Sequence, residues 1–136
     1  MNKNYYHKTK YRLNADRYEQ LPDDIGREVA FAGRSNVGKS SVINTITVQK
    51  SLARASKTPG RTRHLVCFDI DDDRRLIDLP GYGYAKVSLS MKSHWGKILD
   101  RYFCERRSLV GLVLIMDIRH PLKEYDCQML NWCSSQ

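Results

Sequence analysis

Apolar residues follow two different periods along this chain, and the change from one to the other outlines its structural elements. Residues 28–33 are a short apolar run that ends in Gly33, which predicts a strand. From residue 39 to residue 48, the apolar positions Val42, Ile43 and Ile46 recur at helical spacing. The sequence therefore predicts a strand, a loop and a helix in succession.

Two further apolar segments, residues 64–70 and 74–79, flank three consecutive aspartates at positions 71–73. This pattern predicts two antiparallel strands joined by a tight acidic turn. Three adjacent carboxylates could also bind a metal ion, but a solvated hairpin turn is the preferred interpretation.

The second half of the chain predicts helix, strand and helix. Six apolar residues lie on one face of a predicted helix: Met91, Trp95, Ile98, Leu99, Tyr102 and Phe103. Ser88 or Ser90 would cap this helix. We interpret its aromatic residues as core rather than as a surface on which bases stack. Residues 109–117 are a continuous apolar run, the pattern of a strand buried on both faces of a parallel sheet. A last helix is expected to open at Pro121 with these residues facing inward: Leu122, Tyr125, Met129, Trp132 and Cys133.

Strands that alternate with helices predict an α/β layered domain. The chain has 136 residues, of which 41% are hydrophobic and 28% charged, so it fits one globular domain and not a disordered or fibrous class. Residues 1–27 are polar and irregular, and we expect a mobile N-terminal arm before a domain at residues 28–136. No stretch predicts a secretory signal or a membrane span.

Charge and cysteine usage narrow the expected partners and compartment. The formal net charge is +8, which favours polyanionic partners. Residues 50–64 predict a flexible cationic loop with five basic residues and no acid: Lys50, Arg54, Lys57, Arg61 and Arg63. The four cysteines have neither metal-knuckle nor disulfide-framework spacing, so reduced thiols in a cytosol are expected.

Residues 33–40 spell GRSNVGKS, the complete phosphate-loop pattern G-x-x-x-x-G-K-[ST]. The glycines let backbone N–H groups turn toward phosphate oxygens, and the following helix adds its positive N-terminal end. Lys39 would reach the β and γ phosphates, and the Ser40 hydroxyl would ligate Mg²⁺. A glycine-rich turn with a solvated lysine is the alternative. The candidate phosphate-binding residues are Gly33, Arg34, Ser35, Asn36, Val37, Gly38, Lys39 and Ser40.

Two downstream segments extend the candidate site. Asp78 ends a predicted strand in the string DLPG, where a phosphate-loop enzyme needs an acid near magnesium, and Gly81 lets its N–H approach a γ phosphate without steric hindrance. Residues 57–63, KTPGRTR, lie where GTPases carry a switch segment whose threonine closes over magnesium. Thr62 is the first candidate and Thr58 the second. A plain turn and a cationic surface loop are the respective alternatives.

Four strings in order, GRSNVGKSS, SKTPGRT, DLPGYGYA and MDIRHPLK, closely resemble the EngB/YihA/YsxC family of bacterial Era-like, TRAFAC-class GTP-binding proteins. The resemblance covers about residues 20–133 and implies a P-loop NTPase fold, the three-layer small G domain with a mostly parallel sheet. It implies GTP or GDP as nucleotide, and Ser40 and Thr62 as Mg²⁺ ligands. It assigns switch I to Gly60, Arg61, Thr62, Arg63 and His64, and the start of switch II to Asp78, Leu79, Pro80 and Gly81.

By the same resemblance, the chain would be a Mg²⁺-dependent GTPase switch in large ribosomal subunit assembly, needed for normal cell division and septation. The expected partner is the large ribosomal subunit or ribosomal RNA, without membrane or DNA, and the expected state is a monomer in a bacterial cytoplasm. The positive charge fits an RNA partner. Two other functions stay open: a P-loop ATPase or phosphotransferase, and a non-catalytic basic RNA-binding remnant.

Two departures from the family pattern affect the expected chemistry. The family continues with a strand bearing T-K-x-D, whose Asp reads guanine, whereas this sequence has no such motif and stops at Gln136. A truncated domain without the last strands and helix is therefore expected. Residues 109–117 would form an unpaired, aggregation-prone edge of the sheet. Nucleotide binding would be weak or absent. Tyr82 stands at the position of the glutamine that orients the attacking water in well-known GTPases, which predicts slow hydrolysis. Lys39 and Thr62 would assist the reaction. A partner, or K⁺ bound at Asn36, would stimulate it.

Overall fold

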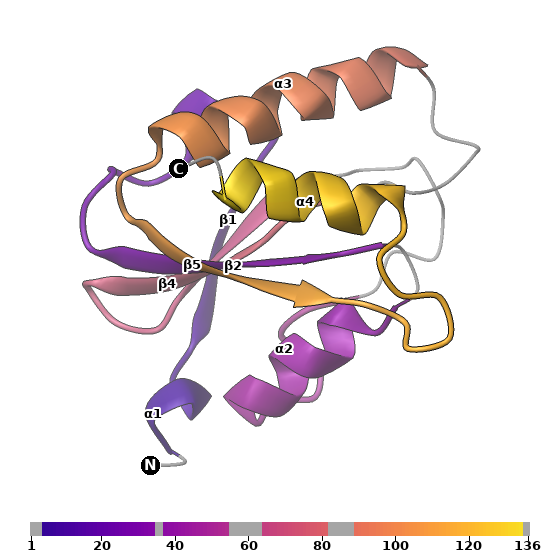
Figure 1. The fold of residues 1–136 in the computed structure, drawn as a ribbon. Helices are drawn as coiled ribbons and strands as arrows, with labels where there is room; N and C mark the ends of the chain where they lie inside the picture. The colour runs from indigo at the N-terminus through magenta and orange to yellow at the C-terminus, as the bar shows by residue number, and fades with distance from the viewer. Residues whose placement is uncertain (1–3, 35–36, 55–63, 82–88, 135–136) are drawn as a thin grey trace.

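A five-stranded sheet forms the middle layer of the fold, with α2 on one face and α3 and α4 on the other (Figure 1). The computed structural model describes residues 4–34, 37–54, 64–81 and 89–134, without the side chains of 89–93. The elements are α1 (Asn4–His7), β1 (Lys10–Ala15), the 3-10 helix η1 (Tyr18–Gln20), β2 (Arg27–Gly33), α2 (Lys39–Thr47), β3 (Leu65–Asp69), β4 (Arg74–Asp78), α3 (Leu89–Glu105), β5 (Leu109–Ile115) and α4 (Glu124–Ser134). No helix among these residues is both long and apolar enough to cross a bilayer.

The strand order is β1-β3-β4-β2-β5. β2 pairs in parallel with β4 and β5, whereas β3 pairs antiparallel with β1 and β4. Of the described strands, only β3 therefore runs against the others. The predicted α/β class with a mostly parallel sheet is confirmed, as are the predicted strands and helix between residues 28 and 79.

The alternating side chains of β2 build two cores, one on each face of the sheet. Ala30 belongs to the core under α3, where Trp95 and Tyr102 are buried. Phe31 points to the opposite face and packs in a cluster with Ile43 of α2. The interpretation of the α3 aromatic residues as core is thus confirmed for those whose side chains are described.

The start of α3 differs from the predicted cap. The helix begins at Leu89, so Ser90 lies inside its first turn instead of capping it. The alternative cap, Ser88, and the side chain of Met91 lie outside the described residues.

Residues 10–15 correct the expectation of an irregular N-terminal arm. They form β1, which pairs antiparallel with β3 from Lys10 opposite Asp69 to Ala15 opposite Leu65. Ala15 is fully buried, but most other β1 side chains are exposed because the strand lies at the edge of the sheet. An edge strand with polar residues on both sides lacks the apolar alternation that predicts a strand, which explains the error.

The turn between β3 and β4 is held by the side chain of Asp71. Its Oδ1 accepts hydrogen bonds from the backbone N–H groups of Asp73 at 2.9 Å and Arg74 at 2.8 Å. An aspartate that binds backbone groups two residues onward stabilises a turn. The interpretation of the three aspartates as a hairpin turn is confirmed.

α4 begins at Glu124 rather than at Pro121. Leu122, predicted to face inward, instead has a left-handed φ of 53° and is 57% exposed, and Cys133 is exposed as well. The reason lies in the cap: the carboxylate of Asp126, the third residue of the helix, accepts the N–H of Lys123 at 3.0 Å and fixes the start there. Tyr125 and Met129 are buried as predicted, and Trp132 packs against the same core.

β5 is the edge strand beside β2, and it is less buried than its apolar sequence predicts. None of its residues is fully buried, and the side chains of Val110 and Val113 are 61% and 37% exposed. In the described part of the chain, no strand pairs with its outer side. The expectation of burial on both faces is wrong there, because such burial requires helices over both faces and these side chains are left uncovered. The expectation that this strand forms an unpaired apolar edge of the sheet agrees with the structure of the described residues.

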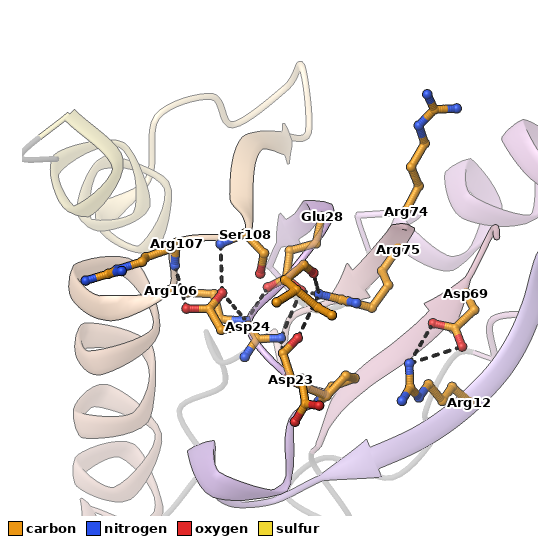
Figure 2. A network of polar contacts seen from close by, with 12 residues as sticks. Arg12, Asp23, Asp24, Glu28, Asp69, Arg74, Arg75, Arg106, Arg107 and Ser108 are labelled. Atoms are coloured by element: carbon orange, nitrogen blue, oxygen red, sulfur yellow. Dashed lines mark hydrogen bonds and ion pairs between the residues drawn. The ribbon is translucent and has the colours of Figure 1, made fainter. Parts of the chain in front are cut away.

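A buried carboxylate at the start of β2, Glu28, gathers charged side chains from two other elements (Figure 2). It accepts hydrogen bonds from Arg75 Nε on β4 at 3.0 Å and from Arg106 Nε, directly after α3, at 2.8 Å. The hydroxyl of Tyr102 donates to the same carboxylate at 2.9 Å. Glu28 is 0% exposed, Arg75 4% and Arg106 7%. The sequence pattern gives no sign of this network, because charged residues are normally expected at the surface.

The guanidinium groups also order the segment that precedes β2. Arg75 donates to the carbonyl of Ile25 at 2.6 Å, and Arg106 donates to the carbonyl of Pro22 at 2.8 Å. Asp24 accepts the N–H groups of Arg107 and Ser108 at 2.9 and 2.7 Å. Residues 22–25 are therefore attached to the amino end of the sheet by side chains distant in sequence.

Replacing Glu28 with glutamine should destabilise the fold strongly, because two buried guanidinium groups lose their counter-charge. We expect the free energy of unfolding to fall by ~3–5 kcal/mol, measured by urea denaturation. The matched control is Asp69→Asn, which removes the exposed pair with Arg12 (3.4 Å, side chains 44% and 33% exposed) and should cost less than ~1 kcal/mol. Equal effects of the two substitutions would contradict a structural role for the buried network.

Candidate phosphate-binding site

The candidate site lies where three parallel strands end side by side. In the β2–β4 register Phe31 is opposite Asp78, and in the β2–β5 register Gly33 is opposite Ile115. The loop that follows Gly33 therefore leaves the sheet between the carboxyl ends of β4 and β5. In open α/β sheets, this edge is where ligands bind.

Gly33 makes the closest approach between the loop and the sheet. A Cβ atom built on Gly33 would lie 2.8 Å from Val37 Cγ2 and 3.1 Å from the carbonyl oxygen of Ile115. Both distances are shorter than ordinary carbon contacts, so only glycine fits without movement of the loop. The first glycine of the motif is thus required by packing against β5.

Gly38 turns the loop into α2. It has a left-handed φ of 96° and is the N-cap residue of the helix, and its carbonyl accepts the N–H of Val42 at 3.0 Å. Lys39 and Ser40 form the first turn of α2, where backbone N–H groups have no acceptor within the helix. Together with the helix dipole, these N–H groups favour an anion at this position.

Lys39 connects the phosphate loop to the end of β4. Its Nζ lies 2.8 Å from Asp78 Oδ1, and it also donates a hydrogen bond to the carbonyl oxygen of Leu79. The Lys39 and Asp78 side chains are 14% and 13% exposed. Leu79 is held in turn by its N–H, which donates to the carbonyl of Phe31 at 2.9 Å. The two motifs that the sequence separates by 39 positions are brought into direct contact.

Pro80 is fixed from the other face of the sheet by a residue whose polar contact the sequence did not indicate. The hydroxyl of Tyr125, on α4, donates to the carbonyl oxygen of Pro80 at 3.2 Å. Tyr125 was predicted only as an inward-facing core residue. Its partner is a backbone carbonyl distant in sequence, and no sequence pattern indicates such a pairing.

Asp117 follows β5 at the same edge of the sheet and is held by its neighbour Arg119. The Arg119 guanidinium donates to the Asp117 carboxylate at 2.8 and 3.1 Å, and its backbone N–H donates at 2.9 Å. These bonds favour the charged form and lower the pKa of Asp117 to about 2. Asp117 therefore remains a carboxylate under ordinary conditions and stabilises the turn after β5.

Ten of the predicted site residues lie in the described loop, helix start and β4 end: Gly33, Arg34, Val37, Gly38, Lys39, Ser40, Asp78, Leu79, Pro80 and Gly81. His64 is described as the residue before β3, and its buried Nδ1 has no hydrogen-bond partner. The remaining predicted residues lie outside the described residues: Ser35, Asn36, Gly60, Arg61, Thr62 and Arg63, with the reserve Thr58 and Tyr82.

The donor atoms present suit a hard cation rather than a structural transition metal. In the ranges that the structure describes, no three His, Cys, Asp or Glu side chains gather as a metal site. Of the two predicted ligands, Ser40 lies in the first turn of α2 and Thr62 lies outside the described residues, while Asp78, the expected acid near the cation, ends β4 and contacts Lys39. Hydroxyl and carboxylate oxygens, completed by phosphate and water, are ligands typical of Mg²⁺.

β2 leads through the phosphate loop into α2, and Lys39 at the start of this helix contacts Asp78 of the neighbouring strand. This arrangement defines a P-loop nucleotide-binding fold. A family model for 50S ribosome-binding GTPases matches residues 28–136. The chain belongs to this family.

Curated relatives give the same picture. A protein of Xanthomonas campestris pv. campestris (strain 8004), named "Probable GTP-binding protein EngB", is 60% identical over 127 residues, 93% of this chain and 61% of the relative. The protein of the same name from Ruthia magnifica subsp. Calyptogena magnifica is 56% identical over 131 residues, 96% of this chain and 66% of the relative. A structure described as that of a probable GTP-binding protein engB matches 64% of this chain and 47% of its own with 30% identity and a TM-score of 0.44. The chain thus spans about 61% of the length of the first relative, and its similarity to EngB proteins is confirmed.

Adding one methyl group at Gly33 should disturb the loop, whereas adding one at Gly96 of α3 should not. We expect Gly33→Ala to lower the free energy of unfolding by ~1–3 kcal/mol, because the Cβ meets Val37 and the backbone of β5. A Cβ at Gly96 meets nothing within 4 Å, and alanine favours a helix, so Gly96→Ala should raise stability by ~0.5–1 kcal/mol. Urea denaturation of both variants tests this, and a Gly33→Ala variant as stable as the parent would contradict the close approach.

Proposed function

We propose that this chain binds a guanine nucleotide through residues 33–40 and acts as a Mg²⁺-dependent GTPase switch in large ribosomal subunit assembly. The observation that carries the proposal is the contact between Lys39 and Asp78, because it joins the phosphate loop to the segment expected to meet a γ phosphate. Guanine, rather than adenine, is supported by the names of the relatives, which are GTP-binding proteins. The sequence itself contains no T-K-x-D motif to read the base.

Binding would use the groups that the loop already aligns. The N–H groups at the start of α2 would donate to phosphate oxygens, and the Lys39 ammonium would exchange Asp78 and Leu79 for the β and γ phosphates. Ser40 and Thr62 would ligate Mg²⁺, with Asp78 as their neighbour. When bound, Mg²⁺ would neutralise negative charge on the β and γ phosphates.

The switch would act through loops on either side of this contact. The γ phosphate would order Thr62 and Gly81, and its loss on hydrolysis would release both segments. Tyr82 stands where a glutamine would orient the attacking water, so unassisted hydrolysis is expected to be slow, with Lys39 and Thr62 assisting. A partner, or K⁺ bound at Asn36, would supply the remaining acceleration.

The proposed partner is the large ribosomal subunit or its RNA in a bacterial cytoplasm. The family description and the formal net charge of +8 support it. Normal cell division and septation would depend on this role indirectly, through the supply of ribosomes.

The test is a titration of the chain with fluorescent GDP in Mg²⁺, followed by competition with GTP and with ATP. We expect saturable binding that GTP displaces better than ATP. Lys39→Ala should weaken it at least about tenfold, a loss of ~1.4 kcal/mol. Lys97→Ala is the matched control, since it removes one exposed lysine charge from α3 and should leave the affinity unchanged.

Three results would overturn this proposal. Displacement by ATP as readily as by GTP would favour an ATPase or phosphotransferase. Absence of saturable binding together with salt-sensitive RNA binding that Lys39→Ala leaves unchanged would favour a basic RNA-binding remnant. Equal losses in Lys39→Ala and Lys97→Ala would mean that net charge, and not the phosphate loop, binds the nucleotide.

A further inference from the structure

The segment from Asp78 to Pro80 is held at successive residues from both faces of the sheet. Lys39 of α2 contacts Asp78 and the carbonyl of Leu79, and Tyr125 of α4 donates to the carbonyl of Pro80 at 3.2 Å. The first of these contacts belongs to the phosphate loop. The second comes from a helix that the phosphate-loop motifs do not include.

The carbonyl that Tyr125 binds belongs to the same peptide unit as the N–H of Gly81. A peptide unit is planar, and the described residues contain no cis peptide bond, so this C=O and N–H point in opposite directions. A hydroxyl that fixes the Pro80 carbonyl toward α4 therefore directs the Gly81 N–H away from α4.

Tyr125 is well placed to impose this direction. Its side chain is 6% exposed and Pro80 is buried, so water competes little for the hydrogen bond. The helix start is fixed by Asp126, which binds the N–H of Lys123 at 3.0 Å, and Met129 anchors the next turn with 0% exposure. The hydroxyl is thus presented by a helix rather than by a loop.

The geometry points to Tyr125 as a positioning residue that orients the Gly81 N–H toward the γ phosphate. This inference rests on the proposed function, in which Gly81 distinguishes a nucleoside triphosphate from a diphosphate. Because the diphosphate lacks the γ phosphate, loss of the Tyr125 hydroxyl should weaken triphosphate binding selectively. A purely structural role would weaken both nucleotides alike.

The test compares Tyr125→Phe with the parent chain for binding of GDP and of the non-hydrolysable analogue β,γ-imido-GTP. The phenylalanine keeps the packing of the ring and removes only the hydroxyl. We expect the affinity for the triphosphate analogue to fall about fivefold to tenfold, the effect of one hydrogen bond, with GDP affinity unchanged within about twofold.

Tyr102→Phe is the matched control. It also removes a buried tyrosine hydroxyl with a hydrogen bond, but at Glu28, about 16 Å along β2 from Gly33 at ~3.3 Å per residue. It should leave the ratio of the two affinities unchanged. Equal weakening of both nucleotides in Tyr125→Phe, or no change in either, would overturn the inference.

A second measurement needs no nucleotide and separates this inference from the proposed function. In amide NMR spectra of the chain alone, Tyr125→Phe should shift the Gly81 N–H resonance, and Tyr102→Phe should not. An unshifted Gly81 resonance would overturn the positioning role. A shifted resonance in a chain that binds no guanine nucleotide would support the orientation of the peptide while rejecting the proposed function and the γ-phosphate role together.

Discussion

The alignment of β2 with β4 decides which residues of the two candidate motifs lie side by side, and the buried pair of Glu28 and Arg75 fixes that alignment. These two residues are direct partners across the strands. Three residues onward, the same register places Phe31 opposite Asp78. A slip by one residue would turn the apolar residues of one strand to the wrong face and leave buried charges unpaired, which costs several kcal/mol. The position of Asp78 beside Lys39 follows from an ion pair at the other end of the strands.

The two ends of the sheet hold their charges in different ways. At the amino end, Glu28 is surrounded by two guanidinium groups and the Tyr102 hydroxyl, and burial raises the pKa of Tyr102 well above its usual value. That hydroxyl remains a donor at all ordinary pH values. At the carboxyl end, the Lys39 and Asp78 side chains are partly exposed. The network around Glu28 joins three charged side chains and a hydroxyl, so the loss of one member would leave buried charges unpaired. This network thus stabilises the fold, and the pair of Lys39 and Asp78 lies where an anion would bind.

Elements with a strong periodic pattern could be predicted from the sequence, and elements defined by their neighbours could not. The strand and helix around residues 33–40 carry both an apolar period and a motif, so their arrangement was predictable. β1 was missed because an edge strand needs no apolar face. β5 was predicted to be more buried because its sequence does not state how far helices cover its faces. The start of α4 was misplaced because a carboxylate three residues into the helix, Asp126, decides it.

The residues of the candidate site likewise fall into those that could be predicted from the sequence and those that could not. Residues that bind through a local motif, such as Gly33 and Lys39, were predictable, since the motif specifies spacing along the chain. Contacts that depend on tertiary packing were not, and the hydrogen bond from Tyr125 to Pro80 is the clearest case. A hydroxyl that binds a backbone carbonyl leaves no trace in the sequence, because any residue type supplies that carbonyl.

These contacts give the two faces of the sheet complementary roles at one segment of chain. From one face, α2 presents Lys39 to Asp78, and from the other, α4 presents Tyr125 to Pro80. α4 packs on β2 and β5, so the position of Tyr125 depends on how firmly the edge strand is held. β2 is paired on both sides and anchored by Glu28, whereas β5 is paired on one side only. The phosphate-loop side of the site is therefore fixed by the centre of the fold, and the orientation of the Pro80 carbonyl depends on its more exposed edge.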